Sequence, residues 1–294
     1  MKRNILLAGI AMAACLLTGC SETADKFDKN GNSWSQGLLG ARLEGSSNYV
    51  SKEFNVRDFD KVVVVGPMDV DYTQRTGERT VKVNTSDNLM DLIDIHIKGR
   101  TLYVGMKRNV RISFKRMDVG ITGGPLKSVT LAGSGDFTMK RGMRTDSFGL
   151  TLNGSGDVEV NGLDCKGDLA VALSGSGDID LHGIAARSVQ MTVAGSGDIE
   201  ATGVKATAVE TAIAGSGDIK LEGLTSEAVY TVAGSGDIVA DNMVADGVEA
   251  SVAGSGDIIC HARKSLKANV AGSGEIGYKG NPAQVSKTKG VKEL

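Results

Sequence analysis

The sequence is short of proline, aromatic residues and basic charge. Its 40 glycines stand beside only 3 prolines and show no collagen triplet, so they indicate either disorder or a repeat punctuated by glycine. Aromatic residues make up 4% of the chain, which leaves few rings on which a sugar could stack. Without Lys2 and Arg3, 31 basic residues (33 less those 2) stand against 35 acidic ones, a net charge of −4. This balance argues against nucleic acid as a partner, because phosphate binding needs a basic surface.

No apolar run is long enough to span a membrane, but a short one at the start predicts export. A basic start precedes an apolar stretch from Ile5 to Leu17, which is the layout of a signal peptide over residues 1–19. The stretch ends in Leu17-Thr18-Gly19-Cys20, which resembles the bacterial lipobox. The resemblance implies cleavage before Cys20 and acylation of its sulfur. An ordinary signal peptide that happens to contain a cysteine is the alternative.

A lipid on Cys20 would hold the mature chain on a membrane, since each buried CH2 group contributes about 0.8 kcal/mol. Ser21 follows the cysteine and, by resemblance to known sorting rules, indicates the outer membrane. We therefore expect an outer-membrane lipoprotein that faces either the periplasm or the cell surface. Residues 20–45 are polar and glycine-rich and would form a tether between lipid and fold.

One short motif, Gly-Ser-Gly-Asp, recurs along the second half of the chain. It occurs seven times, and an eighth copy ends in Glu275 instead of aspartate. The acidic residues follow one another at steps of 21, 21, 20, 20, 19, 20 and 18. A period near 20 over eight copies is the signature of a stacked array. The seven aspartates are Asp136, Asp157, Asp178, Asp198, Asp218, Asp237 and Asp257.

Apolar and polar residues alternate on both sides of each motif. An aliphatic residue stands two positions before every first glycine, as at Leu152. Another apolar residue directly follows every acidic one, as at Val158, and in most copies a polar residue such as Glu159 comes next. Alternation with period two around a glycine turn predicts a strand, a turn and a second strand. A repeat of about 20 residues then has no room for a helix.

These repeats predict an all-β fold, a right-handed parallel β-helix with about 20 residues per coil. Residues 127–281 would form the β-helix, with an irregular β segment at 46–126 closing one end and a tail at 282–294 capping the other. Glycine is expected in the corners because it tolerates positive φ. Cys165 and Cys260 fall on coils roughly 20 Å apart, so no disulfide is expected between them.

The segment before the repeats contains motifs of a known family. Arg57-Asp58-Phe59-Asp60-Lys61-Val62 leads to Gly66-Pro67-Met68-Asp69-Val70. Further on, Pro125-Leu126-Lys127-Ser128-Val129 runs into the first Gly-Ser-Gly-Asp. Over residues 50–280 the chain is similar to the head GIN domain family, the auto-transporter adhesins of bacterial envelope lipoproteins. The resemblance implies a β-helix and an adhesive role, and it supplies no catalytic motif.

The acidic residues of the repeat would form one column along the coils. At about 4.8 Å spacing, neighbouring carboxylates repel by roughly 1 kcal/mol in water, so something must offset the repulsion. We favour hydrogen bonds from turn amides. The alternative is a row of Ca²⁺ ions on Asp136, Asp157, Asp178, Asp198, Asp218, Asp237 and Asp257, although known calcium repeats differ in spacing. No cofactor and no other metal site are predicted.

The sequence favours a binding protein over an enzyme. A strip of mostly small residues, three positions before each first glycine from Thr130 to Asn269, could dock a partner or a second copy. We expect a lipid-anchored envelope binding or adhesion scaffold. Its partners would be the membrane, through Cys20, and an envelope or extracellular protein or glycan. The alternatives are a structural module that self-associates into homo-oligomers and a polysaccharide-active enzyme, which the short uniform turns disfavour.

Overall fold

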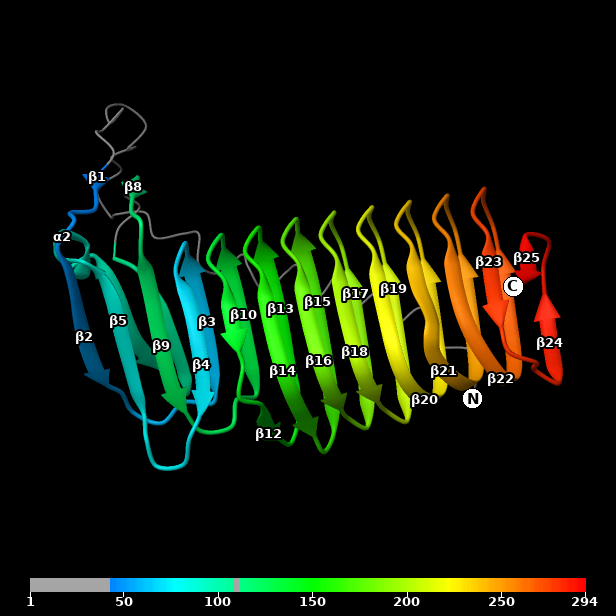
Figure 1. Cartoon of the computed structure of the whole chain (residues 1–294), viewed down its shortest axis with the longest axis horizontal. Helices are drawn as coiled ribbons and strands as arrows, with labels where there is room; N and C mark the ends of the chain where they lie inside the picture. Colours follow the sequence, from blue (N-terminus) through cyan, green and yellow to red (C-terminus); the bar gives the residue numbers. More distant parts are fainter. Residues whose placement is uncertain (1–42, 108–110) are drawn as a thin grey trace, which may run out of the picture. The chain divides into compact units, whose positions relative to one another are not determined.

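The structure is a computed structural model that describes residues 43–107 and 111–294 (Figure 1). The predicted signal peptide at 1–19, the predicted lipid site Cys20 and residues 21–42 of the tether lie outside the described residues. The chain divides into two compact units. In the smaller unit, β1 (Leu43–Glu44) pairs in parallel with β8 (Ile112–Ser113). The larger unit contains the described residues from 45 to 107 and from 114 to 294.

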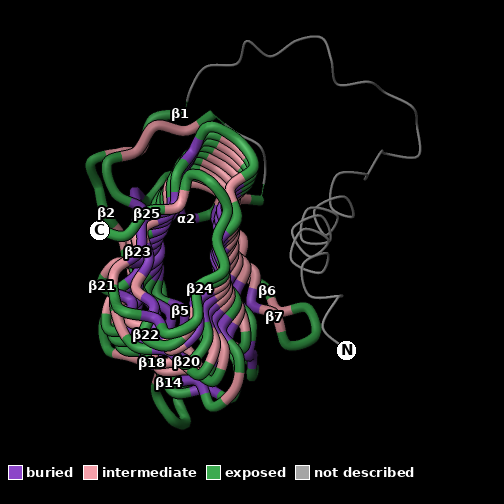
Figure 2. The backbone as a smooth tube through the Cα atoms, turned by 90° about the vertical axis from the view of Figure 1, so that its right-hand side faces the viewer, coloured by how far each residue is buried: buried purple, intermediate pink, exposed green. Residues whose placement is uncertain are grey.

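The larger unit is a parallel β-solenoid of about 8 turns with about 20 residues in each turn, which confirms the predicted fold class. Hydrogen bonds between successive coils form three parallel sheets, which we call A, B and C. Sheet A precedes each Gly-Ser-Gly-Asp corner and sheet B follows it. Sheet C begins after a glycine bend with positive φ, at Gly162, Gly183 and Gly203 in successive coils. Figure 2, which looks along the stack, shows the coils superimposed.

The strands of the repeat region belong to these sheets as follows. Sheet A consists of β10 (Ser128–Gly133), β13 (Phe148–Gly154), β15 (Asp168–Gly175), β17 (Ser188–Val193), β19 (Ala208–Ile213), the later parts of β20 (Ile219–Val232), β21 (Ile238–Val252) and β22 (Ile258–Val270), and β24 (Gln284–Lys287). Sheet B consists of β11 (Phe137–Met139), the first parts of β14 (Val158–Cys165), β16 (Ile179–Ala185), β18 (Ile199–Lys205), β20, β21 and β22, then β23 (Ile276–Lys279) and β25 (Val291–Glu293). Sheet C consists of β12 (Met143–Thr145), the segments after the bends in β14, β16, β18, β20 and β21, and the part of β22 at His261 and Ala262.

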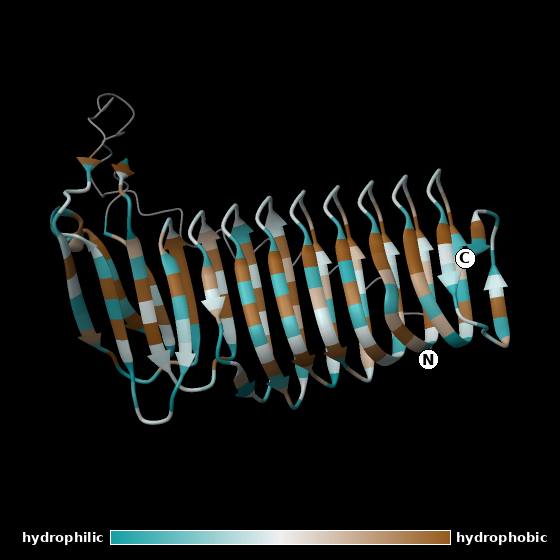
Figure 3. Cartoon of the chain, viewed as in Figure 1, coloured by the Kyte–Doolittle hydropathy of each residue, from teal (hydrophilic) through white to brown (hydrophobic). Residues whose placement is uncertain are grey.

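The period-two alternation fills the inside of the solenoid. Apolar side chains at the predicted inward positions stack in register from coil to coil, as Leu131, Leu152 and Leu173 do in sheet A. Their equivalents in sheet B, beginning with Phe137 and Val158, are also buried. Figure 3 shows the resulting bands of hydrophobic and hydrophilic residues along the strands. Each coil is too small to bury these side chains alone, so the stack itself is the source of stability.

Glycine is required at the corners because the backbones of neighbouring coils approach each other closely there. We expected positive φ here, but among the Gly-Ser-Gly-Asp copies only Gly133 and Gly175 have it. Instead, a Cβ on Gly154 would lie 1.9 Å from the carbonyl oxygen of Gly133. A Cβ on Gly156 would lie 2.0 Å from the carbonyl oxygen of Gly135. No side chain fits at either position, so glycine permits the spacing of the coils at this corner.

The segment at 46–126 extends sheets A and B but not sheet C. Sheet A continues in parallel through β3 (Lys61–Gly66) and β7 (Thr101–Met106), and sheet B through β4 (Asp69–Gln74) and β9 (Met117–Gly123). The strand direction then reverses: β6 (Ile93–Lys98) is antiparallel to β7, β5 (Thr80–Ser86) to β9, and β2 (Tyr49–Asn55) to β5. Helix α2 (Asp87–Met90) buries Leu89 and Met90. The imperfect coils expected here are therefore two-sheet turns that finish in antiparallel strands.

Sheet C starts at β12, whose outer edge has no neighbouring strand among the described residues. A side chain forms the backbone hydrogen bonds that such a strand would form. The Gln74 amide nitrogen donates to the Arg144 carbonyl oxygen at 3.2 Å, and its amide oxygen accepts from the Arg144 N–H at 3.0 Å. On the inner side, the Thr145 hydroxyl donates to the Leu126 carbonyl oxygen at 2.9 Å. These bonds satisfy an edge that would otherwise offer free backbone groups.

The opposite end finishes in a partial coil made by residues 282–294. Here β24 pairs with β22 and β25 pairs with β23. Among the described residues, no strand pairs with the other edge of β24 or β25. The described chain also contains no helix long and apolar enough to cross a membrane.

Candidate binding surface

The acidic residues of the repeat form the predicted column, and each one bonds to the next coil. The backbone N–H of every aspartate from Asp157 to Asp257, and of Glu275, donates to the carboxylate of the preceding column member. The nitrogen–oxygen distances run from 2.7 to 3.0 Å, for instance 2.9 Å from Asp198 to Asp178. The Asp136 N–H donates to Asp69 at 3.1 Å, so Asp69 begins the column. The carboxylates therefore act as acceptors that join one corner to the next.

This column makes one side of the solenoid strongly acidic. The next outward row of sheet B begins with Asp71 and Thr138 and then adds Glu159, Asp180 and Glu200 in register, with Lys220 after them. Burial, followed by the charges of Glu200 and Asp178, raises the pKa of the Asp180 carboxyl above its usual value. Within the described ranges, no group of three or more histidine, cysteine, aspartate or glutamate side chains could hold a metal ion. Calcium on the column stays a hypothesis that a melting experiment can test.

The strip of small residues lies in one row on the outside of sheet A. Thr130 stacks on Thr151, Thr151 on Ala172, and the register continues to Asn269. Toward the other end the same row continues through Val63 to Tyr103 and His96, on strands that precede the repeats. The strip is thus longer than the sequence predicted, and it ends in two rings that stack at 5.0 Å between centroids.

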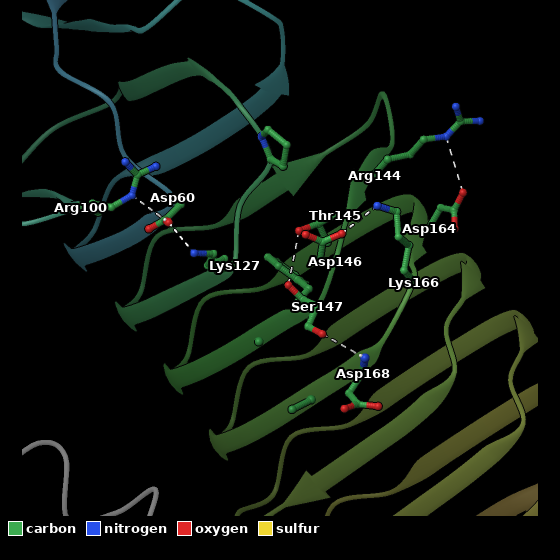
Figure 4. Close-up of a pocket in the computed structure, with 14 residues that line it drawn as sticks. Asp60, Arg100, Lys127, Arg144, Thr145, Asp146, Ser147, Asp164, Lys166 and Asp168 are labelled. Carbon is green, nitrogen blue, oxygen red and sulfur yellow. Dashed lines mark hydrogen bonds and ion pairs between the residues drawn. The ribbon is translucent and has the colours of Figure 1, made fainter.

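A groove of about 880 Å³ lies where sheet C begins and runs along the edge of sheet A. One end is lined by Asp60, Arg100 and Lys127, which come from three separate segments. The middle is lined by the turn at residues 145–147 and by Gly149 and Ala170 of sheet A. Arg144, Asp164, Lys166 and Asp168 line the remainder (Figure 4). The groove exists because the segment before the repeats has no sheet C, so the first strand of that sheet forms a step.

Asp60 is the buried charge of the groove. Its side chain is 8% exposed, and its carboxylate lies 2.9 Å from both Arg100 Nε and Lys127 Nζ. Burial raises the pKa of the Asp60 carboxyl, but the hydrogen bonds from Lys127 and Arg100 outweigh burial and leave that pKa below its ordinary value. Figure 4 shows both cations directed at this carboxylate. Backbone bonds fix the same three segments, because Asp60 N–H donates to Arg100 and Lys127 N–H donates to Asp60.

The other ion pairs of the groove are exposed. Lys166 Nζ lies 2.9 Å from Asp146, and Arg144 Nε lies 3.5 Å from Asp164, all four side chains being more than half exposed. The hydrogen bond from Lys166 lowers the pKa of the Asp146 carboxyl. Exposed pairs of this kind contribute little to stability, about 0 to 1 kcal/mol, so a ligand can replace one partner at small cost. The groove can therefore bind a charged, extended molecule.

Sequence reasoning did not find this groove. Its residues come from segments that are far apart along the chain, and no motif joins them. Asp60 and Lys127 do lie within the two family motifs, and this was the one sequence feature that could have pointed to the groove. The two cysteines among the described residues, Cys165 and Cys260, are buried and form no disulfide with each other, as expected. Burial raises the pKa of the Cys165 thiol to about 11 and that of the Cys260 thiol to about 12, so neither is a reactive thiol.

Comparison with known proteins gives a family and several similar structures. A family model described as "Putative auto-transporter adhesin, head GIN domain" matches residues 58–220 and residues 169–282. A crystal structure of a "putative lipid binding protein" from Parabacteroides distasonis is 26% identical, with a TM-score of 0.64, over 86% of this chain and 100% of that chain. A "putative adhesin" from the same organism is 25% identical, with a TM-score of 0.64 and the same coverage.

A third similar structure supports the fold alone. It is a "putative adhesin" from Parabacteroides merdae, 23% identical, with a TM-score of 0.62, covering 86% of this chain and 99% of that chain. A comparison with curated proteins finds no match.

Proposed function

Because this chain belongs to the head GIN domain family, whose model spans most of it, we propose that it is a binding scaffold of the bacterial envelope. A lipid on Cys20 would anchor the scaffold to the outer membrane, and the solenoid would present a ligand-binding surface at the end of the tether. The family description and one similar structure, 25% identical, name adhesins. Another similar structure, 26% identical, is described as a lipid binding protein, so binding is the property that these relatives share in description.

The observation that carries the proposal is the stacking of the coils in register. Stacking gives a surface whose side chains hold fixed mutual positions over many coils, with the groove at one place on it. A rigid, pre-formed surface binds with a smaller loss of conformational entropy than a flexible one. Such a surface is suited to capture of an extended ligand, which touches several coils at once.

The groove favours binding over catalysis. A general acid for polysaccharide cleavage needs a carboxyl with a raised pKa. In the groove, cations lower the pKa of Asp60 and Asp146. Among the described residues, the carboxyl whose pKa is raised is Asp180, on the outside of sheet B. Within the described repeat region, the short uniform turns also leave no long loops that could close over a substrate.

The anchor is tested by fractionation of cells that produce the full chain. We expect the wild-type protein in the detergent phase of the membrane fraction, and Cys20→Ala in the soluble fraction or retained with an uncleaved signal. Protease treatment of intact cells then reports whether the solenoid faces outward. Because an uncleaved signal can also hold the variant on the membrane, labelled fatty acid is supplied to both strains, and equal incorporation into the wild type and Cys20→Ala would refute lipid anchoring.

The binding role is tested with the acylated full chain, purified in detergent and applied to arrays of glycans and of extracellular matrix proteins. We expect selective, salt-sensitive retention on a subset of the array. The triple substitution described below should reduce it. Uniform absence of binding, together with unchanged adherence of cells that lack the protein, would contradict the role.

A second function, self-association, is favoured by the strand edges at the two ends of the solenoid. In the described part of the chain, β2 and β6 at one end, and β24 and β25 at the other, each pair along one edge. Exposed edges can pair with another copy. Light scattering of the purified chain decides this point, because a monomer at micromolar concentration removes self-association through these edges.

A further inference from the structure

Basic side chains gather at the end of the groove formed by the segment before the repeats. Arg100 and Lys127 hold Asp60 there, and Lys61 lies beside them in the outward row of sheet A. Lys98 continues this row, since Lys61 pairs with Thr101 and Thr101 pairs with Lys98. We call Lys61, Lys98, Arg100 and Lys127 the basic cluster. By strand spacing, the Cα atoms of Lys61 and Lys98 lie about 10 Å apart.

Cations outnumber carboxylates in this cluster. Arg100 and Lys127 share one carboxylate, that of Asp60. Within the described residues, Lys61 and Lys98 have no carboxylate within 4.0 Å, and both side chains are exposed. Four positive charges therefore surround one almost fully buried carboxylate, while two exposed carboxylates border the cluster: Asp146, which interacts with Lys127, and Asp94, which lies 3.2 Å from His96 Nδ1. The cluster carries an unbalanced positive charge, which attracts an anion.

Asp60 gives the cluster a fixed geometry. The Asp60 side chain is 8% exposed, whereas those of Arg100 and Lys127 are 61% and 66% exposed. Both cations thus bind one buried carboxylate on their inner side and remain exposed to solvent on their outer side. A planar guanidinium oriented in this way can still donate its other N–H groups to a carboxylate or phosphate of a ligand. Asp60 is accordingly a positioning residue for the anion site.

Two aromatic rings adjoin the basic cluster. His96 and Tyr103 stack with an interplanar angle of 7°, and His96 is about half exposed. They lie two residues along their strands from Lys98 and Thr101, which is about 7 Å at the rise of a β-strand. Both rings point outward on sheet A, at the end of the strip of small residues. Rings beside cations form a surface for a molecule that has an apolar face and anionic groups.

The rest of the surface restricts where an acidic molecule can bind. The aspartate column is negative along the repeat, and the adjoining row of sheet B is acidic over the three coils of Glu159, Asp180 and Glu200. Elsewhere on sheet A, Lys267 is paired with Glu249 of the neighbouring coil, and Lys287, in the last coil, lies over the Tyr278 ring. An acidic ligand is therefore repelled from the corner and sheet B and attracted to the basic cluster.

On these observations we propose that the basic cluster and the His96–Tyr103 pair bind an acidic polysaccharide. One of its sugar carboxylates would lie between Arg100, Lys127 and Lys61, and a neighbouring sugar ring would lie against the two rings. The chain would then run along the groove and the strip of small residues. This inference rests on the proposed binding function and adds the class of ligand.

The test measures binding of hexagalacturonate to the acylated full chain in detergent. The variant is Asp60→Asn with Arg100→Gln and Lys127→Gln, which removes both cations without leaving a buried charge unpaired. We expect its affinity to fall at least tenfold, the effect of losing charge-assisted hydrogen bonds. The matched control is Arg263→Gln with Lys267→Gln, whose side chains are 61% and 68% exposed and ion-paired in other coils. It should bind like the wild type.

Two further measurements separate a sugar site from a plain anion site. His96→Ala with Tyr103→Ala should weaken binding of hexagalacturonate and leave binding of inorganic phosphate unchanged. Neutral maltohexaose should bind at least tenfold more weakly than hexagalacturonate. Equal binding of poly-L-glutamate and hexagalacturonate would overturn the assignment to a sugar in favour of an acidic peptide.

The outcome for this inference is distinct from the outcome for the proposed function. Failure of the wild type to bind hexagalacturonate, or equal binding by the charge variant and its control, overturns the acidic-polysaccharide site. Selective binding of the wild type on the arrays would still support a scaffold in that case. Circular dichroism and a thermal melt of each variant verify that it is folded before binding is compared.

Discussion

At the scale of single residues, the corner glycines decide how closely the coils approach. Those of neighbouring coils sit almost in backbone contact, so the first and third residues of the motif admit no Cβ. The serine between them is exposed in each copy, so its side chain lies outside this contact. The same reasoning separates glycines that the fold needs from glycines that it tolerates.

Gly156→Ala should destabilise the solenoid by about 3 kcal/mol, because the new methyl group would lie 2.0 Å from the Gly135 carbonyl oxygen and force two coils apart. Gly149→Ala is the control, since the nearest atom to its Cβ would be 3.8 Å away. That substitution should be neutral or slightly stabilising. Urea unfolding of both variants measures the difference, and equal effects would show that contact between corners is not what selects glycine.

Asp60 should make the free energy of unfolding depend on pH in the acidic range. Its pKa is lowered in the folded chain, so its stabilisation is complete above the unfolded pKa of about 3.9 and is lost as pH falls through the folded pKa. Asp60→Asn should reduce the free energy of unfolding by about 1 kcal/mol at pH 7, and the difference from wild type should shrink toward pH 2. Asp146→Asn, in an exposed pair, should leave the urea midpoint unchanged. A pH-independent difference for Asp60→Asn would contradict this account.

At the scale of the strands and corners, the aspartate column joins each turn to the one before it. The bond from the Asp198 N–H to the Asp178 carboxylate ties two corners that are 20 residues apart. Repetition of this bond explains why the motif keeps its aspartate although the carboxylates repel one another. Lys292 pairs with Glu275 at the last corner, where the column ends in glutamate.

Asp178→Ala should lower the free energy of unfolding by about 1 kcal/mol, because the Asp198 N–H loses its acceptor. Asp180→Ala, two residues away, should be neutral or stabilising, since burial and neighbouring acids already disfavour the ionised form of Asp180.

The same samples test the calcium hypothesis: millimolar Ca²⁺ and a chelator should both leave the melting temperature unchanged. A rise with Ca²⁺ that the chelator reverses would assign the column to calcium instead.

The strands of the repeat were predictable from sequence, whereas residues 46–126 were predicted only as an irregular β segment. Period-two alternation around each motif gives the strands of sheets A and B, as at Leu152 and Val158. Sheet C was missed, because it is short and its glycine bends, such as Gly162, look like ordinary loop residues. The antiparallel pairing of β2, β5 and β6 was not predicted, since pairing direction is set by contacts distant in sequence. The groove lies where sheet C begins, next to the segment that precedes the repeats. Because neither sheet C nor the strand pairing of that segment was predicted, the groove could not be predicted from the sequence.

At the scale of the whole solenoid, charge is distributed unevenly. The corner that carries the aspartate column and the outside of sheet B are acidic, and the basic cluster occupies the opposite edge of sheet A near the antiparallel strands. A nearly neutral chain, with a formal charge of −2, therefore presents a negative side and a local positive site. This arrangement orients an acidic ligand along the groove and keeps it from the column.

The central claim is that the segment before the repeats shares one stack with them, because only then do Asp60 and Lys127 line the same groove. Val63 and Thr130 are paired neighbours in sheet A, about 5 Å apart, whereas Thr151 lies one coil further, about 10 Å from Val63. We expect Val63→Cys with Thr130→Cys to form a disulfide under mild oxidation, which peptide mapping by mass spectrometry detects, and Val63→Cys with Thr151→Cys to remain reduced. Absence of the first disulfide, or equal formation of both, would contradict the stack and the groove built on it.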